Sequence, residues 1–280
     1  MSESASTSAL PAGSGEQPKL FARSRKRTAT PELLCDVVFR PLAHLVVLAL
    51  LPLRVPPTAV LLAGTATGLV AAFAIGGAHL AVAAVLLQAK TVLDNADGQL
   101  ARGAGRVSVL GRYLDSESDL LVNAAVFAGL GYYTTDYLLA AVGFVVLTLV
   151  LSVDFNLGVL YRREHGEAVD PMPPAAGFAG LLAGVYGVVY APHDRLIEGV
   201  VAGRLRRLGA DAEMRLAYHD RATLAILANF GLSTQLAALG VCLLLGIPGA
   251  YLWLVLACGA ALIPLAIRRE RLARRLPALS

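Results

Sequence analysis

The chain has 280 residues, of which 56% are hydrophobic and 16% charged, and its mean hydropathy is +0.64. This composition argues against an ordinary soluble globular protein and favours an all-α polytopic membrane protein. The formal net charge of +4 comes from basic residues gathered in clusters between apolar stretches, which is typical of cytoplasmic loops.

The first 30 residues are polar and include the basic run RSRKR, from Arg23 to Arg27. They predict a disordered cytoplasmic tail, residues 1–30. The basic run could face nucleic acid, but its position beside an apolar stretch favours anionic lipid, so we expect no nucleic-acid partner. Residues 31–53 are apolar but interrupted by charge, and the clean run after His44 is too short to cross a bilayer. We therefore expect an amphipathic helix in the membrane interface.

Six later stretches are long enough to form transmembrane helices, each of which needs about 20 residues. They cover 57–76, 79–101, 108–132, 135–160, 222–246 and 250–267. Together they predict a six-helix catalytic domain over 54–268, followed by a basic cytoplasmic tail, 269–280. With these spans every basic cluster lies on the side of the N-terminal tail, which the positive-inside bias makes the cytoplasm. The richness in Ala, Gly and Arg favours a bacterial plasma (inner) membrane.

A further stretch, 172–192, is also long enough to span. If it did, the arginines of 204–207 would move to the opposite side of the membrane, against the positive-inside bias. We therefore interpret 172–192 as an interfacial or re-entrant helix within a cytoplasmic insertion over about 162–220.

Four aspartates interrupt the second and third spans, where charge is costly. At about 100° per residue, Asp94 and Asp97 share one face of the second helix, and Asp115 and Asp119 share one face of the third. A short turn joins these antiparallel helices, so the four carboxylates converge. They require protonation or a cation between them, and oxygen ligands without Cys or His select Mg²⁺, Mn²⁺ or Ca²⁺.

The same faces carry three small residues, Gly98, Ala101 and Gly111. These allow either tight packing of helices or space for a flat ligand against the backbone. Arg102, at the mouth of the site, can bind a phosphate through two hydrogen bonds. Metal ligands, an arginine and a floor of small residues together indicate a site for a diphosphate, such as a nucleotide.

These eight residues read D-x2-D-G-x2-A-R-x8-G-x3-D-x3-D over 94–119. The pattern resembles the signature of the CDP-alcohol phosphatidyltransferase family and is complete at every fixed position. The resemblance implies transfer of a phosphatidyl group from a CDP-linked lipid, usually CDP-diacylglycerol, to an alcohol, with release of CMP. It also implies a homodimer with its active site open to the cytoplasm.

The resemblance further implies the roles of single residues. Asp94, Asp97 and Asp115 would bind Mg²⁺ or Mn²⁺. Asp119 would complete the shell of a second ion and, as general base, take the proton from the acceptor hydroxyl. The CDP part would contact Asp94, Asp97, Gly98, Ala101, Arg102 and Gly111.

The acceptor is less constrained by the sequence. Lys90 lies one turn from Asp94 on the same face, which predicts an ion pair with Asp94 or Asp154, or contact with an acceptor phosphate. Three arginines at the ends of the fourth and fifth spans could flank a pocket beside the general base: Arg162, Arg163 and Arg221. They favour a phosphorylated polyol, such as inositol phosphate or glycerol phosphate, over serine, an unphosphorylated polyol or a second lipid. Arginines at these places also serve as cytoplasmic anchors.

Two other functions fit part of the pattern. A divalent-cation transporter would explain the aspartates, but Arg102 at the mouth would repel its substrate. A membrane scaffold without activity could also retain the motif.

Overall fold

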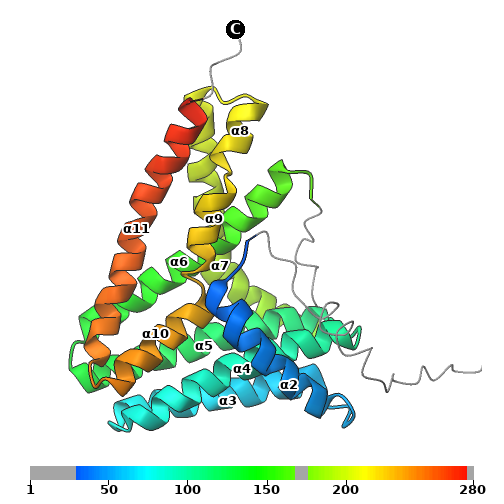
Figure 1. The fold of residues 1–280 in the computed structure, drawn as a ribbon, viewed down its shortest axis with the longest axis vertical. Helices are drawn as coiled ribbons and strands as arrows, with labels where there is room; N and C mark the ends of the chain where they lie inside the picture. Colours follow the sequence, from blue (N-terminus) through cyan, green and yellow to red (C-terminus); the bar gives the residue numbers. More distant parts are fainter. Residues whose placement is uncertain (1–29, 168–175, 276–280) are drawn as a thin grey trace, which may run out of the picture.

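In the computed structural model, the described residues are 30–167 and 176–275. Most of the predicted tail 1–30, and residues 276–280 of the predicted C-terminal tail, lie outside them. Throughout these residues the regular structure is helical (Figure 1). In chain order the elements are the π-helical turn η1 (Cys35–Phe39), α2 (Arg40–Leu50), α3 (Pro57–Gly76), α4 (Leu80–Gly103), α5 (Val109–Thr134), α6 (Tyr137–Glu164), α7 (Gly177–Leu208), α8 (Ala212–Tyr218), α9 (Arg221–Ala228), α10 (Leu232–Leu244) and α11 (Pro248–Arg274).

The turn between α4 and α5 is built from local sequence signals. The backbone N–H of Arg106 donates to the carbonyl of Ala101 over 2.8 Å, and Gly105 adopts a φ of +64°, a left-handed conformation that glycine tolerates at the end of a helix. Ser108 then caps α5, because its Oγ accepts from the N–H of Gly111 at 3.0 Å. The chain therefore reverses within a few residues and brings the two motif-bearing helices together.

Helix α3 packs along both α4 and α5 (Figure 1), and its contact with α5 depends on glycines at two close approaches. A methyl group at Gly129 of α5 would lie 2.5 Å from the backbone oxygen of Ala72 in α3. A methyl group at Gly68 of α3 would lie 2.6 Å from Cγ1 of Val122. Small residues let the backbones approach closely, as is common between membrane helices.

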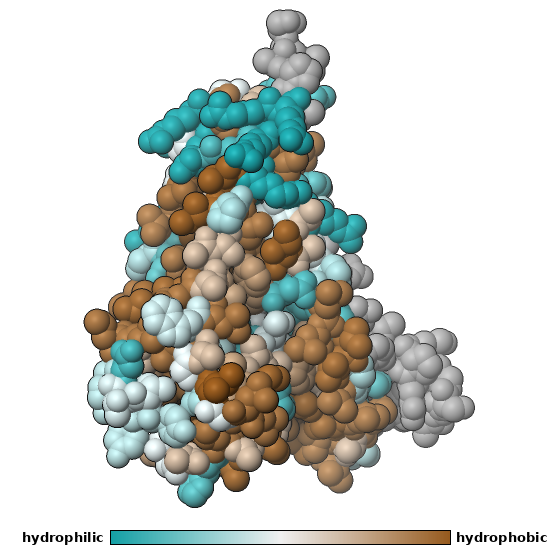
Figure 2. Space-filling view, turned by 60° about the vertical axis from the view of Figure 1, so that its left-hand side comes forward, coloured by the Kyte–Doolittle hydropathy of each residue, from teal (hydrophilic) through white to brown (hydrophobic). Residues whose placement is uncertain are grey.

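Four segments of the described residues are long and apolar enough to cross a membrane: α3, α6, the stretch Ala212–Leu244 that holds α8 to α10, and α11. Helices α4 and α5 carry the charged motif and are not among them, so the count of six spans stays a prediction. Figure 2 shows extensive apolar surface below a hydrophilic end, where α11 finishes. Exposed apolar side chains of α11, such as Trp253 and Ile263, give way there to exposed Arg271 and Arg274. The chain is an integral membrane protein by this composition and arrangement.

Two sequence predictions about helix bounds need correction. The span 222–246 is interrupted, because α9 ends at Ala228 and α10 begins at Leu232. Asn229 sits in the break: its side chain accepts from the N–H of Leu33 at 3.0 Å and donates to the carbonyl of Ala225 at 2.7 Å. The asparagine thus fastens the N-terminal segment to the bundle.

The helix predicted over 172–192 is longer and begins later, over Gly177–Leu208, with Pro192 inside it. Residues 172–175 lie outside the described part of the chain. Helix α7 is not among the four membrane-length apolar segments, and its interfacial position stays a prediction.

The predicted interfacial helix 31–53 corresponds to η1 and α2, which end at Leu50. One face lies on the bundle: Ala43 and Val47 are buried in a cluster with Ala96 and Leu100 of α4. The backbone oxygen of Arg40 also accepts a hydrogen bond of 2.9 Å from the buried side chain of Gln99 on α4. These contacts fix the N-terminal segment against the start of the motif.

Candidate metal and nucleotide site

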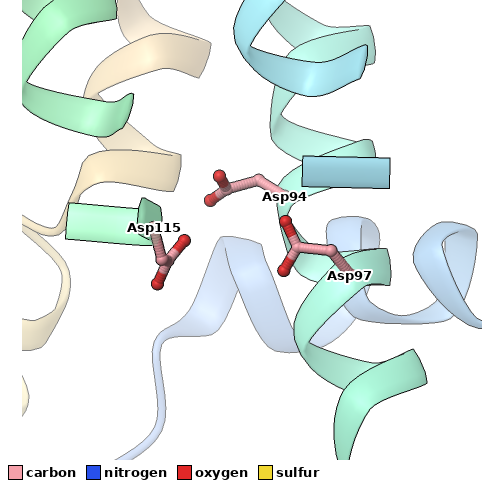
Figure 3. A group of neighbouring side chains, drawn as sticks. All are labelled: Asp94, Asp97 and Asp115. Carbon is pink, nitrogen blue, oxygen red and sulfur yellow. The ribbon is translucent and has the colours of Figure 1, made fainter. Parts of the chain in front are cut away.

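Three of the four motif aspartates converge between α4 and α5. Oxygens of Asp94, Asp97 and Asp115 all lie within 4.8 Å of one another, and Figure 3 shows the carboxyl groups facing a common space. Oδ2 of Asp97 is buried and, among the described residues, accepts no hydrogen bond. A buried carboxylate oxygen without a donor, beside two further carboxylates, fits a hard divalent cation.

The fourth aspartate has a different neighbour. Asp119 forms an ion pair with Lys90, whose Nζ also lies 3.0 Å from Oδ1 of Asp94. The Lys90 side chain is only 2% exposed, whereas that of Asp119 is 25% exposed. Among the partners that the sequence predicted for Lys90, the structure shows Asp94, and it adds Asp119 from the facing helix.

The two motif glycines do not mediate helix packing. A methyl group at Gly98 would meet the Arg102 guanidinium first, at 3.1 Å from Nη1, and one at Gly111 would meet only Oγ of Ser108. This differs from Gly68 and Gly129, where the neighbour belongs to another helix. Gly98 lets the guanidinium of Arg102 lie back along α4. Ala101, half-buried on α4, precedes that arginine.

A cavity of about 160 Å³ connects the motif to the N-terminal segment. It is lined by the motif residues Asp94, Asp97, Gly98, Arg102 and Asp115, by Asn95 and Gln99 of α4, by Ser233 of α10, and by Glu32, Cys35 and Arg40.

Sequence reasoning missed the contribution of the N-terminal segment to this cavity. Arg40 is 6% exposed and paired with Asp36 one turn earlier, and Cys35 donates from Sγ to Oδ1 of Asn95 at 3.2 Å. In the sequence, Asp36 and Arg40 stand out only as a charged pair inside an apolar stretch. That pair predicted that the stretch does not cross the membrane, but not that it lines the site. A second guanidinium therefore lies beside Arg102 at this cavity.

Helix α7 packs against α5. The Tyr190 hydroxyl donates to the carbonyl of Ser116 at 3.3 Å, and Tyr186 donates to Oδ2 of Asp194 at 3.1 Å. Asn156 of α6 donates to the other oxygen of Asp194 at 2.7 Å. Burial, and next the negative charge of Asp119, raise the pKa of the Tyr190 hydroxyl, so it stays protonated at neutral pH. The sequence offered no motif for these tyrosines.

The three predicted acceptor arginines lie at helix ends. Arg163 is 3.6 Å from Glu198 of α7, and Arg162 donates to the carbonyl of Gly158 in its own helix at 3.4 Å. Arg221 begins α9 and is exposed. Their binding of an acceptor stays a prediction.

These features define a helical membrane protein with a carboxylate and arginine site next to the turn between two helices. The family model for CDP-alcohol phosphatidyltransferases matches residues 45–262, and the chain belongs to this family. A search of curated proteins gives no match. The family transfers a phosphatidyl group from a CDP-alcohol to an alcohol and uses a divalent metal, so the chain is a membrane-bound transferase of phospholipid biosynthesis. Arg40 and Cys35 precede the matched region.

Proposed function

We propose that the protein transfers the phosphatidyl group of CDP-diacylglycerol to a small alcohol and releases CMP. The observation that carries the proposal is the convergence of Asp94, Asp97 and Asp115 beside Arg102 around one cavity. Mg²⁺ or Mn²⁺ held by these carboxylates would neutralise charge on the diphosphate. We assign the CDP part to Asp94, Asp97, Gly98, Ala101, Arg102 and Gly111.

In this proposal Asp119 is the general base. Its carboxylate takes the proton of the acceptor hydroxyl as the acceptor oxygen bonds to the phosphatidyl phosphorus. The bond from that phosphorus to the CMP oxygen breaks, and CMP leaves with the electron pair. The pairing with Lys90 supports this role, because it holds the carboxylate in one orientation while a quarter of its surface stays open.

The proposed setting is a bacterial plasma membrane, with both termini and the site at the cytoplasmic face, and a homodimer as the assembly. The exposed arginines at the end of α11 support this orientation. For the acceptor we propose a phosphorylated polyol, such as inositol phosphate or glycerol phosphate, bound with the help of Arg162, Arg163 and Arg221. A lipid donor in the bilayer and a water-soluble acceptor can both reach a site at this boundary.

The test is transfer by the purified protein. Radiolabelled CDP-diacylglycerol, Mg²⁺ and a panel of phosphorylated and unphosphorylated alcohols should give CMP and a new lipid, whose mass identifies the acceptor. Chelation should stop the reaction. If Mn²⁺ binds but no acceptor in a broad panel yields CMP, the protein is not an active transferase and the scaffold alternative gains support.

Arg40 provides a prediction for donor binding. We expect Arg40→Ala to raise the KM for the CDP-linked donor about tenfold with a smaller change in kcat, because a charge-assisted hydrogen bond contributes roughly 1.5 kcal/mol. Steady-state kinetics over a range of donor concentrations measure this. Arg54→Ala is the control, since Arg54 is exposed in the turn after α2.

The same arginine also pairs with Asp36, so a folding defect has to be separated from a binding defect. Arg40→Lys keeps a positive charge for Asp36 but cannot present two parallel N–H groups to a phosphate. It should melt like the wild type and still show a raised KM. An unchanged KM in the folded Arg40→Ala protein would remove Arg40 from the donor site.

A further inference from the structure

Lys90 lies deeper than any other charged group of the site. Its side chain is 2% exposed, and among the described residues it is one of the largest side chains that are fully buried. A buried ammonium is costly unless it is paired, and here two carboxylates, Asp94 and Asp119, supply that pairing from two helices.

The packing around Lys90 leaves its stem little freedom. A methyl group at Gly68 of α3 would lie 3.3 Å from Cγ of Lys90 and 2.6 Å from Cγ1 of Val122. The aliphatic part of the lysine is therefore enclosed between α3 and α5. An ion arriving at Asp119 could not push the ammonium aside without disturbing this contact between helices.

The four motif carboxylates consequently fall into two sets. Oxygens of Asp94, Asp97 and Asp115 lie close enough together for one ion, whereas Asp119 is held by Lys90. A second divalent ion at Asp119 would have to sit beside a fixed positive charge. With one divalent ion, Lys90 and Arg102, the positive charge already equals that of the four carboxylates.

We propose that Lys90 is a built-in second cation, and that this chain binds one divalent ion where the family resemblance implies two. The inference rests on the metal site of the proposed function but not on the transfer reaction. Lys90 acts as a positioning residue that takes the place of an ion beside Asp119.

The experiment counts Mn²⁺ ions per chain in the full-length protein, in detergent and without donor or acceptor. Calorimetry gives the number bound, and electron paramagnetic resonance detects the broadening that two neighbouring Mn²⁺ ions cause. We expect one ion in the wild type and two in Lys90→Met, which removes the ammonium group from beside Asp119. The double variant Lys90→Met/Asp119→Asn should return to one ion.

Gln88→Met is the matched control, because Gln88 lies on another face of α4 and donates to the carbonyl of Leu236 at 3.1 Å. It should bind one ion. Two ions in the wild type, or one in folded Lys90→Met, would overturn the inference. The wild-type count decides even if Lys90→Met does not fold. A wild type that binds no ion would instead contradict the metal site itself, so the two failures differ.

Discussion

Replacing Asp119 with asparagine is expected to lower the rate of phosphatidyl transfer about a thousandfold, within the range that a general base contributes. The affinity for CDP should change no more than a few-fold, because the proposed nucleotide contacts lie on α4 and at Gly111. Asparagine keeps a side-chain oxygen for the hydrogen bond from Lys90 but cannot accept the proton of the acceptor. Single-turnover transfer and equilibrium binding of CDP measure the two quantities separately.

The control is the same substitution at the other end of the bundle. Asp136 caps α6, with Oδ1 accepting from the N–H of Leu139 at 3.0 Å, and asparagine is an equally good cap. Asp136→Asn should therefore retain full transfer activity. If Asp119→Asn loses CDP binding together with transfer, Asp119 shapes the nucleotide site and is not the base.

The helix bounds could be predicted well from the sequence wherever the residues that end a helix are neighbours in the chain. The predicted span 57–76 coincides with α3, and α5 starts one residue after the predicted bound, at the cap formed by Ser108. Sequence reasoning missed the break at Asn229, because that residue is stabilised there by Pro31 and Leu33, almost 200 positions earlier in the chain. A partner so distant in sequence leaves no periodic signal.

In the candidate site, too, the features set by nearby residues were predictable, and those set by residues distant in the sequence were not. Spacing along each helix placed Asp94 with Asp97, and the short turn brought Asp115 to them, as the 4.8 Å grouping shows. The bond between Lys90 and Asp119 depends on how α4 and α5 are rotated against each other, which spacing along one helix does not define. The cavity wall contributed by Arg40 depends on where a separate segment docks. Both are tertiary features.

A substitution at Asp97 is expected to change stability in opposite directions with and without metal. Asp97 is 6% exposed, and its carboxyl group faces those of Asp94 and Asp115 (Figure 3). Without an ion, the folded protein bears the cost of burying the Asp97 charge and of holding it beside the like charges of Asp94 and Asp115. Asp97→Asn removes this charge, so the variant should be more stable than the wild type by on the order of 1 kcal/mol in chelator.

Metal should reverse this order. An ion that binds only the folded protein stabilises it by about 2.7 kcal/mol at a concentration one hundred times its Kd, and the amide of asparagine is a weaker ligand than a carboxylate. Wild-type Tm should therefore rise on titration with Mn²⁺, while Asp97→Asn should respond little and lose transfer activity. Thermal unfolding in detergent, with chelator and across the Mn²⁺ series, measures both effects, and Asp136→Asn should follow the wild type.

A metal centre is identified by the reversal of the order of stability: Asp97→Asn is more stable than the wild type in chelator and less stable in Mn²⁺. A carboxylate that served only to hold the fold would make Asp97→Asn less stable under both conditions and leave its response to Mn²⁺ intact. That outcome would remove Asp97 from the proposed ligands. It would also leave the buried Oδ2, which has no donor among the described residues, without a role in binding an ion.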